Sequence, residues 1–208
     1  MAARSRPTDV RPYRPGDRQD LYEVCVRTGD GGADATGLFT TDDLLPDVFL
    51  GPYLAIEPGL AFVVDTGERA SGYVVAAADT ERFVAEHRRR WLPRFAATYP
   101  LTEPATTPEE RLVLLGHRPE AMLALASDRY PAHLHIDLLP DVQGRGLGRA
   151  LIRLLLGALR ARGVPGVHLG VGARNTAAIA FYERLGFATL PAPDDATVVL
   201  GLSTSTQV

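Results

Sequence analysis

Apolar and polar residues follow two different periods along the chain, and these predict strands and helices in turn. Continuous or alternating apolar runs predict strands, among them a hairpin made of LAFVVD and SGYVVAAA around the turn TGERA. Apolar residues three and four apart predict helices that begin at a Thr or Asp cap or end at glycine. The expected elements are a strand at 9–16, a helix at 17–29, a short helix broken at Gly51–Pro52, the hairpin, a helix at 79–95, a strand at 132–139, a helix at 146–162, a strand at 166–171, a helix at 175–185, and strands at 187–190 and 196–202.

The length of 208 residues and the apolar content of 46% are enough to bury one sizeable core. We therefore expect a single α/β domain over residues 1–208. The segment 98–131 interrupts the regular pattern, because it is rich in proline and contains one predicted helix near 109–115. This segment is interpreted as an insertion over one face of the sheet, before the strand at 132–139.

The charge balance excludes some partners. The 22 Lys and Arg residues against 25 Asp and Glu give a net charge of −3, and the basic residues are spread along the chain, so no nucleic acid is expected. The single cysteine, Cys25, rules out an internal disulfide framework. The N-terminal stretch MAARSRPTDV lacks the apolar centre of a signal peptide, and no apolar run is long enough for a membrane span. A cytoplasmic protein is the expectation.

The most informative stretch joins the strand at 132–139 to the long helix that follows. The residues at this junction are Gln143, Gly144, Arg145, Gly146, Leu147, Gly148 and Arg149. Glycines at a helix N-terminus expose unpaired backbone N–H groups at the positive end of the helix dipole. Such a terminus binds anions, and the glutamine and arginines add side-chain donors.

Three other interpretations of this region fit less well. A dinucleotide-binding loop needs glycine at its sixth position, where this chain has Arg149, and an acidic ribose-binding residue downstream. A tight turn alone would need only one glycine. A metal site built from His133, His135 and Asp137 resembles part of the metallo-β-lactamase motif, but Leu138 stands where that motif has another histidine. No metal is expected.

Two motifs in the second half of the chain resemble the GNAT family of N-acetyltransferases. The family's acetyl-CoA loop, Arg/Gln-x-x-Gly-x-Gly/Ala after a strand that ends near a proline, is matched by Pro140, Gln143, Gly146 and Gly148. Its next signature is matched by Asn175, Ala178, Tyr182, Gly186 and Phe187. The resemblance is close over 132–190, and the first half fits in element order. Within the family, the N-terminal stretches resemble the acetyltransferase-like domain at the C-terminus of O-GlcNAcase and its stand-alone bacterial relatives; unlike the animal members, this chain keeps every glycine of the loop.

The resemblance implies a fold and a set of binding residues. The expected fold is a mixed, mostly antiparallel sheet with helices on both faces and two central parallel strands that splay apart. The pantetheine arm of acetyl-CoA would bond to backbone groups of Leu138 and Leu139 like an added strand. The N–H near Leu138 would stabilise the oxyanion of the tetrahedral intermediate. The loop residues 143–149, Asn175 and Ala178 would bind the rest of the cofactor.

The resemblance also implies direct attack of an amine on the thioester, with Tyr182 as general acid toward the leaving sulfur. The general base is left open by the sequence. His133, His135 and Asp137 alternate with apolar residues, so they share one face of a central strand. Asp137 and His135 are the main candidates, and Asp30 and Asp34 in the glycine-rich loop are further ones.

The predicted function is therefore acetyl-CoA-dependent acetylation of an amine. The alternative is a pseudo-acetyltransferase that binds acetyl-CoA or a partner in its cleft without turnover. The acceptor remains open between a small molecule, a peptide and a protein, and the chain is expected to be a monomer or a homodimer.

Overall fold

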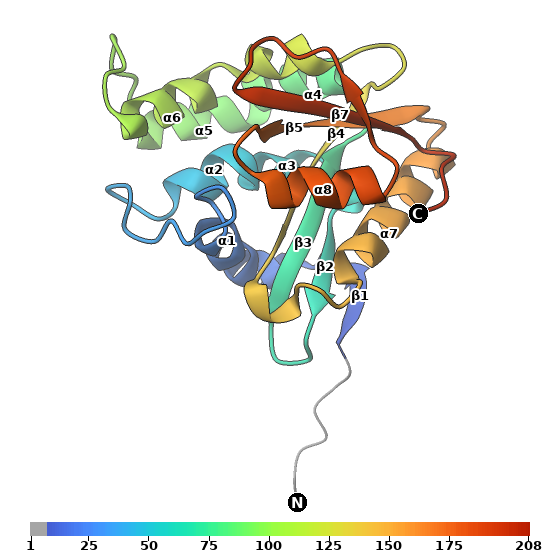
Figure 1. Cartoon of the computed structure of the whole chain (residues 1–208). Coiled ribbons are helices and arrows are strands. Elements are labelled where there is room, and N and C mark those ends of the chain that lie inside the picture. Colours follow the sequence, from blue (N-terminus) through green and yellow to red (C-terminus); the bar gives the residue numbers. More distant parts are fainter. Residues whose placement is uncertain (1–7) are drawn as a thin grey trace, which may run out of the picture.

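The structure is a computed structural model that describes residues 8–208, and its described part contains one seven-stranded sheet (Figure 1). The strand order is β1-β2-β3-β4-β5-β7-β6, and only β4 and β5 run parallel. This mixed, mostly antiparallel sheet confirms the predicted fold class. The strands are β1 (Asp9–Pro12), β2 (Phe62–Asp65), β3 (Ala70–Ala77), β4 (Ala132–Leu138), β5 (Gly166–Gly172), β6 (Ala188–Leu190) and β7 (Thr197–Ser203). Residues 1–7, most of the stretch in which the sequence predicts no signal peptide, lie outside the described residues.

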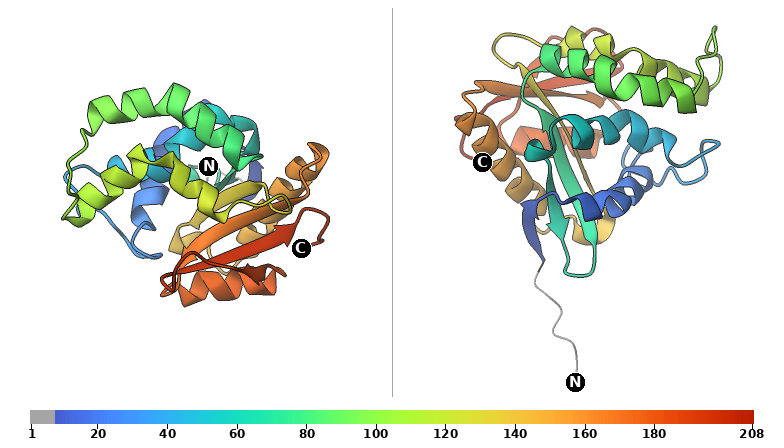
Figure 2. Two further views of the ribbon diagram at one scale, coloured as in Figure 1. Left: turned by 90° about the horizontal axis from the view of Figure 1, so that it is seen from above. Right: turned by 180° about the vertical axis from the view of Figure 1, so that it is seen from behind.

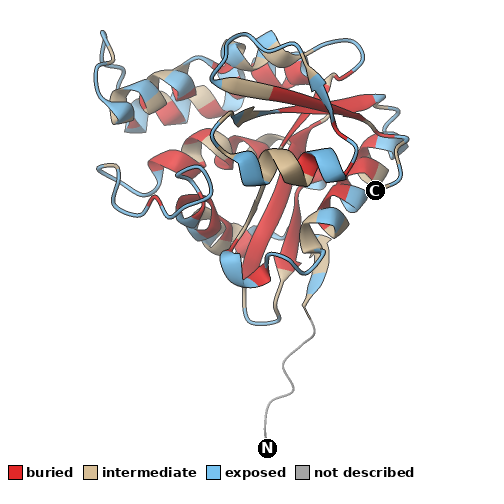
Figure 3. Cartoon of the chain, viewed as in Figure 1, coloured by how far each residue is buried: buried red, intermediate tan, exposed pale blue. Residues whose placement is uncertain are grey.

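Helices cover both faces of the sheet, as Figure 1 and the two further views in Figure 2 show. The long helix α7 (Leu147–Ala161) packs against β1, β2 and β3 on one face. On the other face, α1 (Arg18–Arg27) and α3 (Gly51–Ile56) contact β3. Every residue of β3 is buried, and Figure 3 shows the buried residues gathered where these layers meet. This core fixes the position of β4 beside β3.

The two parallel strands separate soon after they meet. Their pairing is limited to Ala132 with Val167 and His133 with His168. Beyond these residues β4 continues to pair with β3, and β5 with β7, so the C-terminal halves of β4 and β5 diverge. The resulting opening, here called the fork, leaves backbone groups of both strands without a strand partner on that side.

A second layer of helices covers the end of the sheet near α3. It contains α2 (Leu44–Phe49), α4 (Thr80–Glu86), α5 (Leu92–Thr98), α6 (Pro108–His117) and a 3₁₀ helix at Pro119–Leu125. A separate apolar cluster holds α2, α5 and α6 together, and it includes Leu44, Trp91 and Phe95. The segment 98–131 thus contains two helical elements, and its 3₁₀ helix contacts both α4 and β5. The last helix, α8 (Thr176–Arg184), follows β5.

The predicted break at Gly51–Pro52 is confirmed: α2 ends at Phe49 and a new helix, α3, begins at Gly51, because proline in the first turn needs no N–H donor there. Another local prediction was wrong. The predicted helix at 79–95 is interrupted by a π turn at His87–Trp91, where a wider turn separates α4 from α5. The first strand is also shorter than predicted and ends at Pro12. None of the helices in residues 8–208 has the length and apolarity needed to cross a membrane.

Candidate functional site

The glycine loop has the geometry of an open anion site. Gly144 and Gly146 have φ angles of +69° and +76°, in the left-handed region that favours glycine. Gly146 is the N-cap residue of α7, and no side chain caps this terminus. A Cβ atom added to either glycine would meet no other atom within 4 Å. The backbone N–H groups of the first turn of α7 are therefore left free for a bound anion.

Gly148 has a different environment from the two glycines before it. A Cβ atom at this position would lie 3.0 Å from the ring of Phe181 in α8. Gly148 thus allows α7 and α8 to approach each other closely, whatever contact its backbone makes with a ligand. Arg145 and Arg149 are both exposed, and an Nη atom of Arg145 lies 3.5 Å from the hydroxyl of Thr8. Both guanidinium groups can therefore turn toward an anion at the loop.

The last residues of β4 present their backbone in opposite directions. The N–H of Leu139 donates to the carbonyl of Ser71 at 3.0 Å, so this donor is already used by β3. Because successive residues of a strand alternate, the N–H and C=O of Leu138 face the fork. The Leu138 carbonyl accepts a bond of 2.8 Å from the side-chain amide of Gln143. Of the two predicted residues, Leu138 has its backbone groups toward the fork, whereas the Leu139 N–H does not.

Gly72 in β3 permits this arrangement of β4. A Cβ atom at Gly72 would lie 2.9 Å from the side chain of Leu138 and 3.1 Å from the carbonyl of Asp137. Any side chain there would push the end of β4 toward the fork. Sequence reasoning did not identify Gly72, because its importance depends on which residue lies opposite in the neighbouring strand.

Asn175 is the N-cap residue of α8. Its side-chain oxygen accepts a bond of 3.1 Å from the N–H of Ala178, which leaves the Asn175 amide nitrogen as a donor for a ligand. The structure therefore gives Asn175 a definite structural role. Binding of pantetheine by this residue and by Ala178 remains a prediction.

Tyr182 lies in α8 with its ring packed against Phe181 and Phe187 at centroid distances of 5.3 Å. The side chain is buried, and its burial raises the pKa of the phenol, with a smaller contribution from the negative charge of Asp137. The hydroxyl is consequently protonated at neutral pH and can donate a proton. The negative charge of Asp137, a predicted base, thus acts on the predicted acid.

The three polar residues of β4 have separate environments. His133 is buried, and its two ring nitrogens lie 2.9 Å from the hydroxyl of Thr80 and 2.8 Å from that of Tyr53. Burial lowers the pKa of His133 well below its ordinary value, so the ring is neutral. With both nitrogens engaged by protein hydroxyls, His133 is a core residue and is not free to bind a metal.

Asp137 is the stronger candidate base. It is partly exposed, and it accepts a bond of 2.5 Å from the hydroxyl of Tyr73, the residue directly opposite in β3. Desolvation raises the pKa of Asp137 to about 6, against the opposing effect of the Tyr73 bond. A carboxylate with this pKa is ionised at pH 7 and still basic enough to take a proton. Tyr73 was missed by sequence reasoning, since its apolar neighbours make it look like an ordinary core residue.

His135 is also partly exposed, and its ring contacts the rings of Phe49 and Tyr53 at centroid distances of 5.8 and 5.3 Å. Desolvation by burial lowers the pKa of His135 to about 4, so the ring is neutral at pH 7 and is a weak base. Asp30 and Asp34 are both exposed, in the glycine-rich loop that follows α1. The bonds from Thr36 lower the pKa of Asp34, which makes this carboxylate a poorer base.

A cavity of about 200 Å³ adjoins the fork on the face of β4 that carries the histidines. Its walls come from α2 and α3 through Phe49 and Tyr53, from the π turn through His87, from the 3₁₀ helix at Pro119–Leu125, and from both parallel strands through His135 and Gly170. We refer to it as the fork cavity. Because β4 carries both His135 and Asp137 on this face, the fork cavity borders the predicted site of chemistry.

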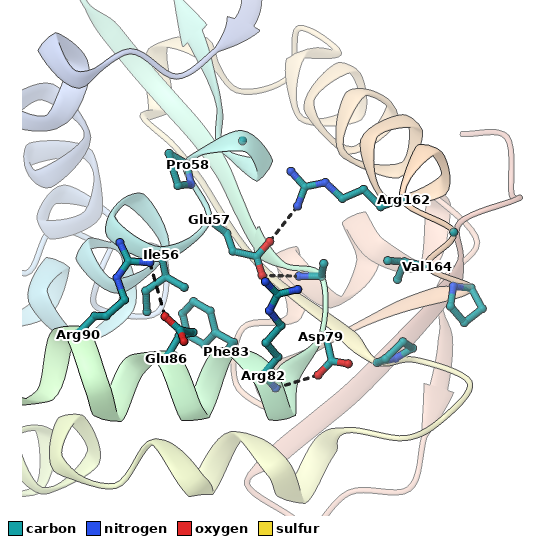
Figure 4. Close-up of a pocket in the computed structure, with 15 residues that line it drawn as sticks. Ile56, Glu57, Pro58, Asp79, Arg82, Phe83, Glu86, Arg90, Arg162 and Val164 are labelled. Carbon is teal, nitrogen blue, oxygen red and sulfur yellow. Dashed lines mark hydrogen bonds and ion pairs between the residues drawn. The ribbon is translucent and has the colours of Figure 1, made fainter.

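A larger pocket of about 610 Å³ lies elsewhere, and Figure 4 shows its lining. It is formed at the C-terminal end of α7. Because α7 has 15 residues, this end lies about 22 Å from the glycine loop at the start of the helix. Two ion pairs lie in its lining: Arg162 bonds to Glu57 at 2.9 Å, and Arg90 lies 3.7 Å from Glu86. Its distance from the loop makes this pocket a poor candidate for the site of chemistry. Within residues 8–208 no three His, Cys, Asp or Glu side chains converge as metal ligands would.

Known proteins match the chain as follows. The profile of the Acetyltransferase (GNAT) family matches residues 38–187. The crystal structure of SsHAT is 49% identical in sequence and has a TM-score of 0.92, over 96% of this chain and 100% of that one. The O-GlcNAcase of Rattus norvegicus is 24% identical over 189 residues, which are 88% of this chain and 20% of that protein. The ribosomal protein bS18-alanine N-acetyltransferase of Escherichia coli K12 is 56% identical over 48 residues, 23% of this chain and 32% of the enzyme. The chain thus spans about a fifth of the length of the rat protein.

Proposed function

The chain belongs to the GNAT acetyltransferase family, and from this premise we propose that it transfers the acetyl group of acetyl-CoA to a primary amine. The observation that carries the proposal is the combination of an open glycine loop with a protonated tyrosine and an ionised carboxylate near the same fork. A loop alone would only bind the cofactor. The acid and the base supply the proton transfers that turnover needs.

The glycine loop would hold the pyrophosphate of acetyl-CoA. The free N–H groups at the start of α7 face the anion, and the side chains of Arg145 and Arg149 add positive charge. The pantetheine arm would enter the fork and bond to the backbone of Leu138, with Gln143 leaving the carbonyl that it now occupies. The amide of Asn175 is a second donor along this path.

Chemistry would take place at the fork between Asp137 and Tyr182. Asp137 removes a proton from the ammonium form of the acceptor, directly or through a water molecule, so that the amine can attack the thioester carbonyl. The N–H of Leu138 stabilises the negative charge that develops on the carbonyl oxygen. When the tetrahedral intermediate collapses, the carbon–sulfur bond breaks and Tyr182 protonates the leaving thiolate. The extra proton on the attacking nitrogen then passes to the Tyr182 phenolate, directly or through water, which leaves the neutral amide and restores the phenol. His135 has a lower pKa than Asp137 and is therefore the weaker base. Its side chain would contribute to the acceptor side of the site.

A turnover assay tests the proposal. Purified protein is incubated with acetyl-CoA and a panel of primary amines, and the release of free coenzyme A thiol is followed together with the acetylated product by mass spectrometry. Amine-dependent thiol release and a product heavier by one acetyl group are expected. Tight binding of acetyl-CoA without any product from amines, peptides or protein N-termini would favour a binding module instead.

A further inference from the structure

The fork cavity contains polar groups that the proposed chemistry does not use. His87, at the start of the π turn, is 2% exposed, and its Nδ1 atom is buried without a hydrogen-bond partner in the described part of the chain. A buried polar atom without a partner is costly, so its retention calls for an explanation. The ring borders the fork cavity, where a bound ligand could supply the missing partner.

The remaining walls of the fork cavity are mainly apolar. They include Phe49, Met122 and Leu125, and Leu115 at the rim is 41% exposed. No carboxylate of the described residues lines the cavity, and the charged side chain on its wall is that of Arg118. Burial lowers the pKa of His87 to about 4, so this ring is neutral at pH 7. The carboxylate whose charge acts on His87 is Glu120, and it is already paired with Arg88. A cationic group would therefore find no free counter-ion here, and its burial would be unfavourable.

The position of the cavity relative to the chemistry defines the length of the ligand. His135 lines the cavity, and Asp137 follows it on the same face of β4. Two residues of a strand span about 7 Å. The His135 side of the cavity therefore lies about 7 Å along β4 from Asp137, where the amine would be deprotonated. This distance corresponds to a short alkyl chain between the amine and the held group.

On these grounds we propose that the fork cavity binds the neutral end group of the acceptor, and that the acceptor is an arylalkylamine-like primary amine whose ring carries a hydrogen-bonding substituent for His87. The inference rests on the proposed acetyl transfer and names its substrate class. It distinguishes this class from polyamines, whose second ammonium group would be buried beside Arg118. Ring and alkyl groups would bury against Phe49, Met122 and Leu125, and the substituent would bond to the imidazole.

The test uses three probe amines: tyramine, 2-phenylethylamine and spermidine. In the wild-type protein, kcat/KM is expected to be about tenfold higher for tyramine than for 2-phenylethylamine, the ratio that one neutral hydrogen bond gives. Spermidine should be the poorest of the three. Higher kcat/KM for spermidine than for both aryl amines would overturn the inference while leaving acetyl transfer intact.

Two variants localise the effect. His87→Phe keeps an aromatic ring and removes the unpaired nitrogen, so the preference for tyramine over 2-phenylethylamine should disappear while the melting temperature stays the same or rises. Ala121→Trp fills the cavity from an exposed position in the 3₁₀ helix, and it should raise KM for both aryl amines at least tenfold. Ala124→Trp, on the same helix and outside the cavity lining, is the matched control with unchanged kinetics. Unchanged KM in Ala121→Trp would show that the acceptor does not occupy the cavity.

A binding measurement keeps the inference separate from the proposed function. If none of the amines is acetylated, tyramine is titrated by calorimetry into protein saturated with coenzyme A. Binding that Ala121→Trp abolishes and Ala124→Trp preserves would support the cavity while refuting turnover. Absence of tyramine binding to the wild-type protein would refute the cavity assignment itself.

Discussion

Replacement of Asp137 by Asn is expected to stabilise the protein and to slow the reaction. Burial raises the pKa of this carboxyl from an ordinary value of 3.8 to about 6. This rise in pKa lowers the free energy of unfolding of the wild-type protein by at most about 3 kcal/mol, because a pKa difference of one corresponds to about 1.36 kcal/mol. Asp137 keeps partial exposure, so solvent screening reduces the gain to about 1 kcal/mol. Asn retains an acceptor for the Tyr73 hydroxyl and has no charge to desolvate.

The stability gain should depend on pH in a defined direction. Below about pH 4 the carboxyl is protonated in both the folded and the unfolded wild-type chain, and the two proteins should differ little. Between about pH 4 and 6 the unfolded chain ionises first, so wild-type stability falls relative to Asp137→Asn. Above pH 6 the difference should be constant, with a melting temperature about 3 °C higher for the variant. Thermal unfolding followed by circular dichroism at several pH values measures this.

The same variant should lose about a hundredfold in kcat with little change in the affinity for acetyl-CoA, since general-base catalysis contributes at least this factor. Asp34→Asn is the matched control, because its carboxylate lies in an exposed loop, and its kcat should equal that of the wild type. An Asp137→Asn protein that is less stable than the wild type at pH 8 would refute the unfavourable desolvation of the Asp137 carboxylate. A variant with full kcat would refute the assignment of Asp137 as the catalytic base.

Three further predictions follow from the same site. Tyr182→Phe should keep the fold and the acetyl-CoA affinity but lower kcat about a hundredfold, least for thioesters with a better leaving thiol; equal losses for all thioesters would argue against proton donation. Gly146→Asp should weaken acetyl-CoA binding at least a hundredfold in calorimetry, whereas Gly146→Asn, equally large and tolerated at positive φ, should weaken it far less; equal losses would show that charge is irrelevant at this position. Asn175→Ala should lower the free energy of unfolding by about 1 kcal/mol, because the α8 cap is lost. A rise in the acetyl-CoA dissociation constant of the same variant would indicate a bond from Asn175 to the cofactor, whereas an unchanged constant would leave only the capping role.

The second half of the chain could be predicted well because its signals are local. The apolar spacing of α7, the glycines before it and the Asn175 cap each depend on neighbours within one or two turns. The family match over 38–187 is consistent with the resemblance identified from these residues. The open space around Gly146 also follows from local backbone geometry.

Features that depend on tertiary contacts were not predictable in the same way. Nothing near His133 in the sequence shows that Tyr53 and Thr80 occupy its two nitrogens, because these residues come from distant helices. The raised pKa of Asp137 depends likewise on burial and on Tyr73 from the neighbouring strand. Nothing near His87 in the sequence shows the π turn and the cavity that make it a candidate ligand contact.

The measurement that tests the central claim most directly is a calorimetric titration of acetyl-CoA into the wild-type protein, with NAD as the comparison ligand. The open loop at the start of α7 predicts one binding site per chain with a micromolar dissociation constant for acetyl-CoA and no measurable heat from NAD. Absence of acetyl-CoA binding, or equal binding of NAD, would contradict the assignment of the loop as a coenzyme A site and with it the proposed acetyl transfer.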